Sequence, residues 1–197
     1  MNTLFDIAPV LPQGFSYYTE FITEAEEQYL LKSIDQFELE TMKFHQYEAK
    51  RKVRSFGNGW SFTEQQLKPG DAIPVAFEFL ISRICERLVI PRDEIAQVLI
   101  TEYPIGSVIN WHRDAPAFDI IAGVSLQSDC NFKLRPYDKQ HQTKAATIIL
   151  LVQKRSLYVM LGRAKADWQH STAPVNKIRY SLTFRTLKRN FDKTILR

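Results

Sequence analysis

The residues most suited to chemistry are His112 and Asp114, in the stretch "INWHRDAPAFD", and His170, in a chain with only four histidines. Residues i and i+2 of an extended segment project to the same face, so His112 and Asp114 can present an imidazole and a carboxylate to one metal ion. A His-x-Asp pair alone is equally compatible with a polar surface turn. The hypothesis of a metal site therefore depends on His170 as a third ligand. The remaining histidines, His45 and His141, have no partner pattern and are expected at the surface.

A second polar pattern lies in "RYSLTFR", residues 179–185, where one strand face carries Arg179, Ser181, Thr183 and Arg185. A guanidinium binds a carboxylate through two parallel hydrogen bonds, which suits an organic acid with two carboxylates. The commoner alternative is an amphipathic strand whose basic face is solvated. Two histidines and one carboxylate with open coordination positions are also the ligand set of non-haem Fe(II) oxygenases.

Two amphipathic helices are expected before any strand-rich region. "ITEAEEQYLLKSIDQF", residues 22–37, begins with a capping box formed by Thr23 and Glu26. Apolar residues at helical spacing predict the second helix over residues 74–89. The first 20 residues are expected to be an irregular arm, and residues 47–62 a strand followed by a hairpin or loop around Gly57 and Gly59.

After Pro91 the chain consists of short segments with strand composition, separated by turns, which predicts an antiparallel sandwich or barrel. These segments are "IAQVLITEY", "SVINWH", "FDIIAGVSLQ", "CNFKLRPY", "ATIILLVQ", "SLYVMLG" and "IRYSLTFRTL". The fold class predicted is α+β, mainly β. Residues 1–197 are expected to form one domain, with helices in 1–90 and the β core in 91–197.

Composition sets few limits on function. The net charge of +4 and the pI of about 9.0 permit a polyanionic partner without requiring one. The two cysteines, Cys85 and Cys130, form no CxxC pair, which favours a reducing compartment. Neither a secretory signal nor an apolar run long enough to span a membrane is recognised, so a cytoplasmic protein without membrane contact is expected, as a monomer.

The ordered set Tyr103, His112-x-Asp114, His170 and Arg179-x-Ser181-x-Thr183-x-Arg185 resembles the AlkB family of Fe(II)- and 2-oxoglutarate-dependent dioxygenases. The resemblance covers roughly residues 45 to 187. It implies a double-stranded β-helix, a jelly-roll variant, preceded by a lid of the kind that recognises nucleotides. It also implies that Fe(II) is the cofactor and that 2-oxoglutarate and O2 are co-substrates.

The roles of individual residues follow from the resemblance. It implies that His112, Asp114 and His170 bind iron. The residues implied to hold 2-oxoglutarate are Tyr103, Thr101, Arg179, Ser181 and Arg185. The implied reaction releases succinate and CO2 and hydroxylates an N-alkyl group on a nucleobase of DNA or RNA, which then leaves as formaldehyde.

The substrate is less clearly implied. In the family the lid contains Arg and aromatic residues, which here correspond to Arg51, Phe56 and Trp60 in "RKVRSFGNGW"; aromatic rings can stack on an unpaired base. A basic hairpin with core aromatics is the equal alternative. Pro116 stands where several repair enzymes of the family have an acidic residue that reads the base. Thr101 and Ser181 stand where the family often has Asn.

The sequence is therefore compatible with three functions. The first is oxidative dealkylation of single-stranded or locally opened DNA or RNA. The second is the same oxidation on a protein side chain or small molecule, which Pro116 favours. The third is a non-catalytic jelly-roll binding protein, which the complete set of expected ligands argues against.

Overall fold

The structure, a computed structural model, describes residues 9–44, 47–61 and 64–189. The strands are β1 (Phe15–Tyr18), β2 (Glu40–Phe44), β3 (Tyr47–Ser61), β4 (Gln66–Pro69), β5 (Ile95–Tyr103), β6 (Phe118–Leu126), β7 (Cys130–Pro136), β8 (Ile148–Val152), β9 (Leu157–Met160), β10 (Trp168–Thr172) and β11 (Arg179–Leu187). The helices are α1 (Glu24–Ile34), α2 (Glu78–Leu88) and α3 (Gly162–Ala166), with short 3-10 turns at Val75–Phe77, Arg92–Glu94 and Lys139–His141.

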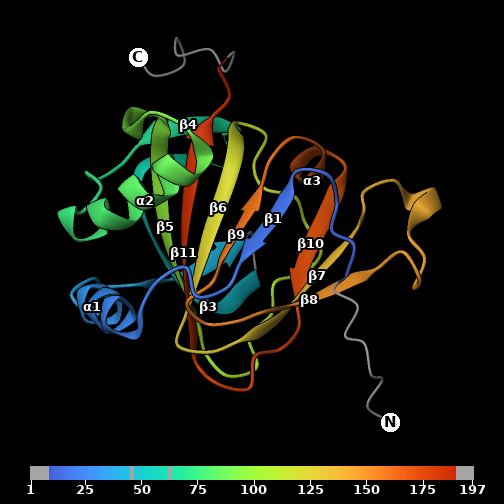
Figure 1. The fold of residues 1–197 in the computed structure, drawn as a ribbon, viewed down its shortest axis with the longest axis horizontal. Coiled ribbons are helices and arrows are strands. Elements are labelled where there is room, and N and C mark those ends of the chain that lie inside the picture. The colour runs from blue at the N-terminus through green and yellow to red at the C-terminus, as the bar shows by residue number, and fades with distance from the viewer. Residues whose placement is uncertain (1–8, 45–46, 62–63, 190–197) are drawn as a thin grey trace.

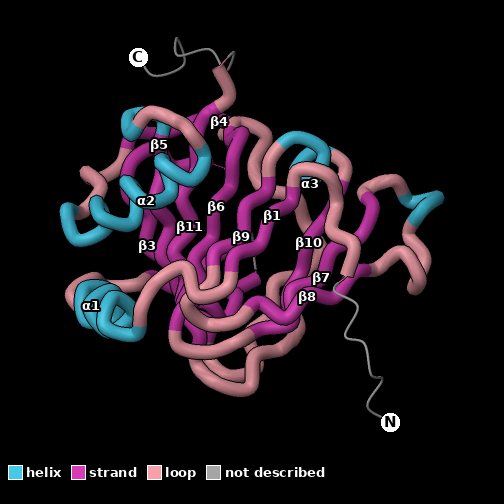
Figure 2. Tube along the Cα trace, viewed as in Figure 1, coloured by secondary structure: helices cyan, strands magenta, loops and turns pink. Residues whose placement is uncertain are grey.

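The strands form two antiparallel sheets, which confirms the predicted mainly β fold of the jelly-roll type (Figure 1). The large sheet has the order β1-β9-β6-β11-β5-β3-β2, with β4 paired to β3, and the small sheet has the order β10-β7-β8. Helices α1 and α2 lie on one side of the large sheet and the small sheet lies on the other (Figure 2).

Strand alternation gives the large sheet two different faces. Val98, Ile100, Leu182 and Phe184 are buried in the cluster that includes the apolar residues of α1 and α2. The opposite face contributes to a second cluster, which also contains Phe132 and Leu134 of the small sheet. The polar face of "RYSLTFR" must therefore point into the space between the two sheets.

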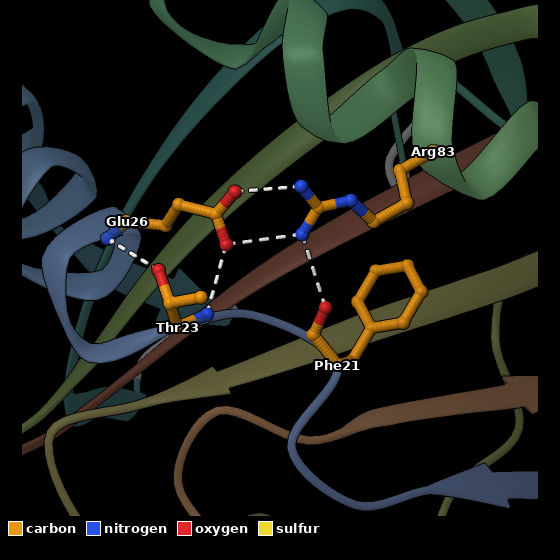
Figure 3. A network of polar contacts seen from close by, with 4 residues as sticks. All are labelled: Phe21, Thr23, Glu26 and Arg83. Carbon is orange, nitrogen blue, oxygen red and sulfur yellow. Dashed lines mark hydrogen bonds and ion pairs between the residues drawn. The ribbon is translucent and has the colours of Figure 1, made fainter.

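Both predicted helices are confirmed, and a polar network joins them (Figure 3). Thr23 and Glu26 form the expected capping box, with Glu26 N donating to Thr23 Oγ1 at 3.2 Å. Arg83 of α2 donates to both carboxylate oxygens of Glu26, at 2.6 and 3.0 Å, and to the carbonyl oxygen of Phe21 at 3.1 Å. One carboxylate thus caps α1 and binds α2 to it.

Three expectations about the elements are wrong. The N-terminal arm contains β1, which pairs with β9. The segment 107–112 forms an isolated bridge at His112 instead of a strand. β3 continues through Gly57 and Gly59, and Gly57, at φ 77°, allows the strand to pass the backbone of Ala96 where a turn was expected.

Among the described residues, the helices are all too short or too polar to cross a membrane. Cys85 and Cys130 are free and buried.

Candidate active site

The three expected metal ligands lie together between the sheets. The candidate ligand atoms of His112, Asp114 and His170 all lie within 4.8 Å of one another. His112 and Asp114 belong to the segment between β5 and β6, and His170 lies in β10. His112 and His170 exchange two backbone hydrogen bonds, of 3.1 and 2.9 Å, so the main chain itself fixes the pair.

Contacts of the two imidazoles with neighbouring groups favour the orientation and protonation state that bind a metal. Nδ1 of His112 lies 2.9 Å from the carbonyl oxygen of Asn110, which selects the tautomer that donates from Nδ1 and leaves Nε2 with a lone pair. The ring of His170 stacks on Phe132 at 5.3 Å. Burial, followed by the neighbouring His112, lowers the pKa of His170 to about 3, so this ring is neutral and able to bind a metal at neutral pH.

Asp114 is oriented by a chain of polar contacts. Arg185 donates from Nη2 to Asp114 Oδ1 at 2.7 Å and from Nη1 to Gln97 Oε1 at 2.7 Å, and Gln97 in turn donates to Ser55 Oγ at 2.9 Å. Burial alone would raise the pKa of Asp114, but Arg185 and the two imidazoles outweigh it and lower the pKa. The carboxylate is therefore ionised, with its second oxygen 3.5 Å from His170 Nε2.

The polar face of β11 is buried, so the alternative of a solvated basic strand is wrong here. Arg179, Ser181 and Thr183 are 2%, 2% and 6% exposed. Arg179 donates from Nε to Ser125 Oγ at 2.9 Å, and its guanidinium lies 4.8 Å from the centre of the Tyr103 ring.

The expected co-substrate residues share this face because of strand register. Tyr103 pairs with Arg179, and Thr101 pairs with Ser181, across β5 and β11. A fully buried guanidinium needs an anionic partner. A carboxylate of a small organic acid is such a partner, so the donor set fits 2-oxoglutarate at this face and a divalent metal at the triad.

The three lid residues lie in different environments. Arg51 is one residue beyond the Lys52–Glu102 pair of β3 and β5, which puts it at the level of Tyr103. Burial raises the pKa of Tyr103, and the charges of Arg179 and Arg51 act in the opposite direction. Trp60 is partly buried and packs against the cluster between the sheets. Phe56 instead is 3% exposed and packs in the helix-side core against Phe37 and Phe77, so it has no surface to offer a base.

The left-handed backbone of Gly57, at φ 77°, explains this difference between Phe56 and Trp60. Before it, β3 pairs with β5 and Phe56 is opposite Val98 of the helix-side core. After it, β3 pairs with β4, and Trp60 is opposite Leu67 of the other cluster. Strict alternation would place both rings on one face, so the left-handed conformation of Gly57 breaks the alternation and turns the second ring toward the site side.

The remaining residues considered from the sequence lie at the edge of the site or outside it. Pro116 and Asp119 are exposed, as is His141, which pairs with Asp138. His45 lies outside the described residues. Trp168 packs against the cluster between the sheets, and Trp111 lies under the Arg135 guanidinium at 4.4 Å.

Sequence reasoning missed Gln97, Ser125, Gly123 and Tyr158, which all lie on the same face of the sheet. A glycine inside a strand pattern signals a close approach of other atoms, so Gly123 was the one detectable member. The others have no sequence signal beyond their position in a strand.

Comparisons of sequence agree with this geometry. A model of the 2OG-Fe(II) oxygenase superfamily matches residues 14–185. The tRNA (carboxymethyluridine(34)-5-O)-methyltransferase ALKBH8 of Mus musculus is 28% identical over 170 residues, covering 83% of this chain and 25% of that protein. The chain thus spans a quarter of the length of that relative. Uncharacterized protein L905 of Acanthamoeba polyphaga mimivirus is 23% identical over 199 residues, covering 88% of this chain and 85% of L905.

Two solved structures share the fold. OsALKBH1 superposes with a TM-score of 0.71 at 11% identity, covering 90% of this chain and 99% of that one. A prolyl-4-hydroxylase of Pseudomonas putida superposes with a TM-score of 0.63 at 16% identity, covering 89% of this chain and 93% of the other. At these identities the two matches establish the fold alone.

Proposed function

Because this chain belongs to the 2OG-Fe(II) oxygenase superfamily, we propose that it is a dioxygenase that removes N-linked alkyl groups from the bases of DNA or RNA. The family uses Fe(II) as cofactor and 2-oxoglutarate and O2 as co-substrates. The observation that carries the chemistry is the cluster of His112, Asp114 and His170 next to a buried strand face with Arg179.

The residues of the site form two groups, one for the metal and one for 2-oxoglutarate. His112, Asp114 and His170 would hold the metal, while Arg185 holds Asp114 in place. Arg179, assisted by Tyr103, would neutralise the carboxylate of 2-oxoglutarate that lies away from the metal, and Thr101, Ser181 and Arg185 would complete the pocket. Burial of this face excludes water, which strengthens each of these electrostatic contacts.

When bound, iron supplies the oxidation: O2 and 2-oxoglutarate are consumed, one oxygen atom enters succinate as CO2 leaves, and the other enters a C–H bond of the substrate. On an N-methyl base the product is an N-hydroxymethyl group, which breaks its C–N bond to give formaldehyde and the unmodified N–H. The residues of the site would hold the reactants and exclude water.

A nucleic-acid substrate is supported by the side of the site formed by β3. Arg51 lies at the level of Tyr103 in the strand register, and the side chain of Lys50 lies beside Gly106 on the loop after β5. Lys52 and Arg54 lie on the other face of β3 from Arg51, opposite Glu102 and the helix-side Ile100. Positive charge at the mouth suits phosphates. The name of the relative ALKBH8 also describes an enzyme that acts on a uridine of tRNA.

A protein side chain is the second candidate substrate. Pro116, exposed beside the triad, replaces the acidic residue that helps several AlkB enzymes read a base. The fold shared with a prolyl-4-hydroxylase makes peptides a reasonable second panel.

The test is to incubate the protein with Fe(II), 2-oxoglutarate and O2, and with DNA or RNA oligonucleotides containing 1-methyladenine or 3-methylcytosine. Formaldehyde and succinate should form in equal amounts, and Asp114→Ala should form neither. Arg51→Ala should weaken oligonucleotide binding and lower the slope of log affinity against log salt by about one, as expected for one lost phosphate contact.

Arg54→Ala is the matched control, because Arg54 lies on the opposite face of β3, where it is paired with Ile100 of the helix-side core and its guanidinium lies 5.7 Å from the centre of the Phe56 ring. It should leave binding unchanged. Succinate without formaldehyde on every alkylated oligonucleotide would contradict the nucleic-acid proposal and leave the oxygenase intact. Hydroxylated peptide from the second panel would then favour the other candidate.

A further inference from the structure

The phenol of Tyr158 lies directly across Gly123, between the two sheets. Tyr158 of β9 and Gly123 of β6 are paired opposite each other. A Cβ atom added to Gly123 would lie 2.2 Å from Cζ and 2.4 Å from the hydroxyl oxygen of Tyr158. The ring therefore occupies the space of the missing side chain, and only glycine at 123 permits this position.

The direction of the ring brings its hydroxyl toward the polar face of β11. Gly123 is paired on its other side with Thr183, so the phenol extends from β9 across β6 toward that strand. Thr183 lies between Arg179 and Arg185 on the buried face. The Tyr158 hydroxyl thus lies on the pocket face that would hold 2-oxoglutarate.

No hydrogen bond joins the Tyr158 hydroxyl to the described residues, although the side chain as a whole is largely buried. Tyr158 is 7% exposed, and its ring packs on Phe15 and Phe132. Tyr17, next to it in the same row of the sheet, has two partners: it donates to Leu151 O at 3.2 Å and accepts from Gln153 N at 2.8 Å. The phenolic O–H of Tyr158 is therefore available to donate a hydrogen bond to a molecule in the pocket.

The electrostatics of the pocket support a donor role. Burial raises the pKa of Tyr158, so the phenol keeps its proton at neutral pH. The positive charges of Arg179 and Arg185 both act on this phenol. A bound carboxylate attracted by these arginines would come within reach of a neutral O–H donor, which is the arrangement of a charge-assisted hydrogen bond.

We propose that Tyr158 is a co-substrate-binding residue whose hydroxyl donates a hydrogen bond to a carboxylate of 2-oxoglutarate held between Arg179 and Arg185. This inference rests on the proposed function, in that it assumes the co-substrate occupies this face of β11. Gly123 then contributes to the site because its lack of a side chain leaves space for the phenol.

The experiment measures 2-oxoglutarate binding directly, by anaerobic titration of the Fe(II)-loaded protein and the visible charge-transfer band that the bound co-substrate produces. Tyr158→Phe removes the hydroxyl and keeps the ring with its contacts to Phe15 and Phe132. The dissociation constant for 2-oxoglutarate should increase about tenfold, which equals about 1.4 kcal/mol. The melting temperature of the metal-free protein should not fall, since the hydroxyl has no partner to lose.

Tyr17→Phe is the matched control, because it removes a hydroxyl from the same row of strands but outside the pocket. It should leave the dissociation constant unchanged. An unchanged constant in Tyr158→Phe, or equal weakening in both variants, would overturn the inference while the wild-type band still supports the oxygenase. Absence of the band in the wild type would overturn the proposed function, and this inference with it.

Discussion

Replacing Arg185 by Met should destabilise the metal-free protein strongly, because Arg185 neutralises a carboxylate that cannot reach water. The side chains of Arg185 and Asp114 are 14% and 7% exposed, and their contact is 2.7 Å long. Breaking a buried pair of this kind costs about 3–5 kcal/mol, because the remaining charge is left without its partner. The nearby His170 offers partial compensation, so the lower end, about 3 kcal/mol, is expected.

For a chain of this size, about 3 kcal/mol corresponds to a fall of about 6–12 °C in melting temperature. The assay is urea and thermal unfolding of the metal-free protein, followed by titration with Co(II) or Mn(II). Metal affinity should fall by about 10–100-fold, since Arg185 orients a ligand without touching the ion.

Arg163→Met is the matched control for this prediction. Arg163 forms a 2.9 Å pair with Asp167, but the two side chains are 72% and 50% exposed. Its loss should cost no more than about 1 kcal/mol and leave metal affinity unchanged. If Arg185→Met destabilised the protein no more than Arg163→Met, the argument that burial makes this pair important would be refuted.

Three further predictions concern the frame of the site. Gly57→Ala should lower the free energy of unfolding in urea by about 1–3 kcal/mol, because φ is 77° and a Cβ atom would lie 2.3 Å from the carbonyl oxygen of Ala96. Gly59→Ala is the control and should lower it less, because the nearest atom to its Cβ would lie at 3.8 Å. Equal losses of stability in the two variants would contradict this prediction. Gly123→Ala should destabilise the wild-type protein more than it destabilises a protein that already carries Tyr158→Leu. The coupling energy in this double-mutant cycle should be about 1–3 kcal/mol, and additive costs would disprove the close contact. The hydrogen bond from Arg83 lowers the pKa of Glu26 to about 2 from the usual 4.5, so Glu26 stabilises the fold above about pH 4.5 and loses this contribution as the pH falls to about 2. The stability difference between wild type and Glu26→Gln should therefore shrink over this range, whereas a difference independent of pH would argue against the bridge between α1 and α2.

Sequence patterns correctly predicted those features that depend on a single helix or strand. The capping box of α1 depends on residues three apart, so Thr23 and Glu26 predicted where the helix begins. Alternation along β11 depends only on the period of a strand, so the sequence predicted that Arg179 and Arg185 share one face. It could not predict that this face is buried, because burial depends on the second sheet that lies above it.

The sequence by itself determined the ligand types, their order along the chain and the alternation of the strands, because these are properties of neighbouring residues. Only the tertiary structure decided which side chains contact one another between the two sheets. The left-handed backbone at Gly57 directs Phe56 to the helix-side core and Trp60 to the site side, and the pairing of β9 with β6 places the Tyr158 phenol over Gly123. In "INWHRDAPAFD", the His-x-Asp pair was equally compatible with a turn. It gains its third partner only because His112 and His170, far apart in the sequence, exchange backbone hydrogen bonds and bring the ligand atoms within 4.8 Å.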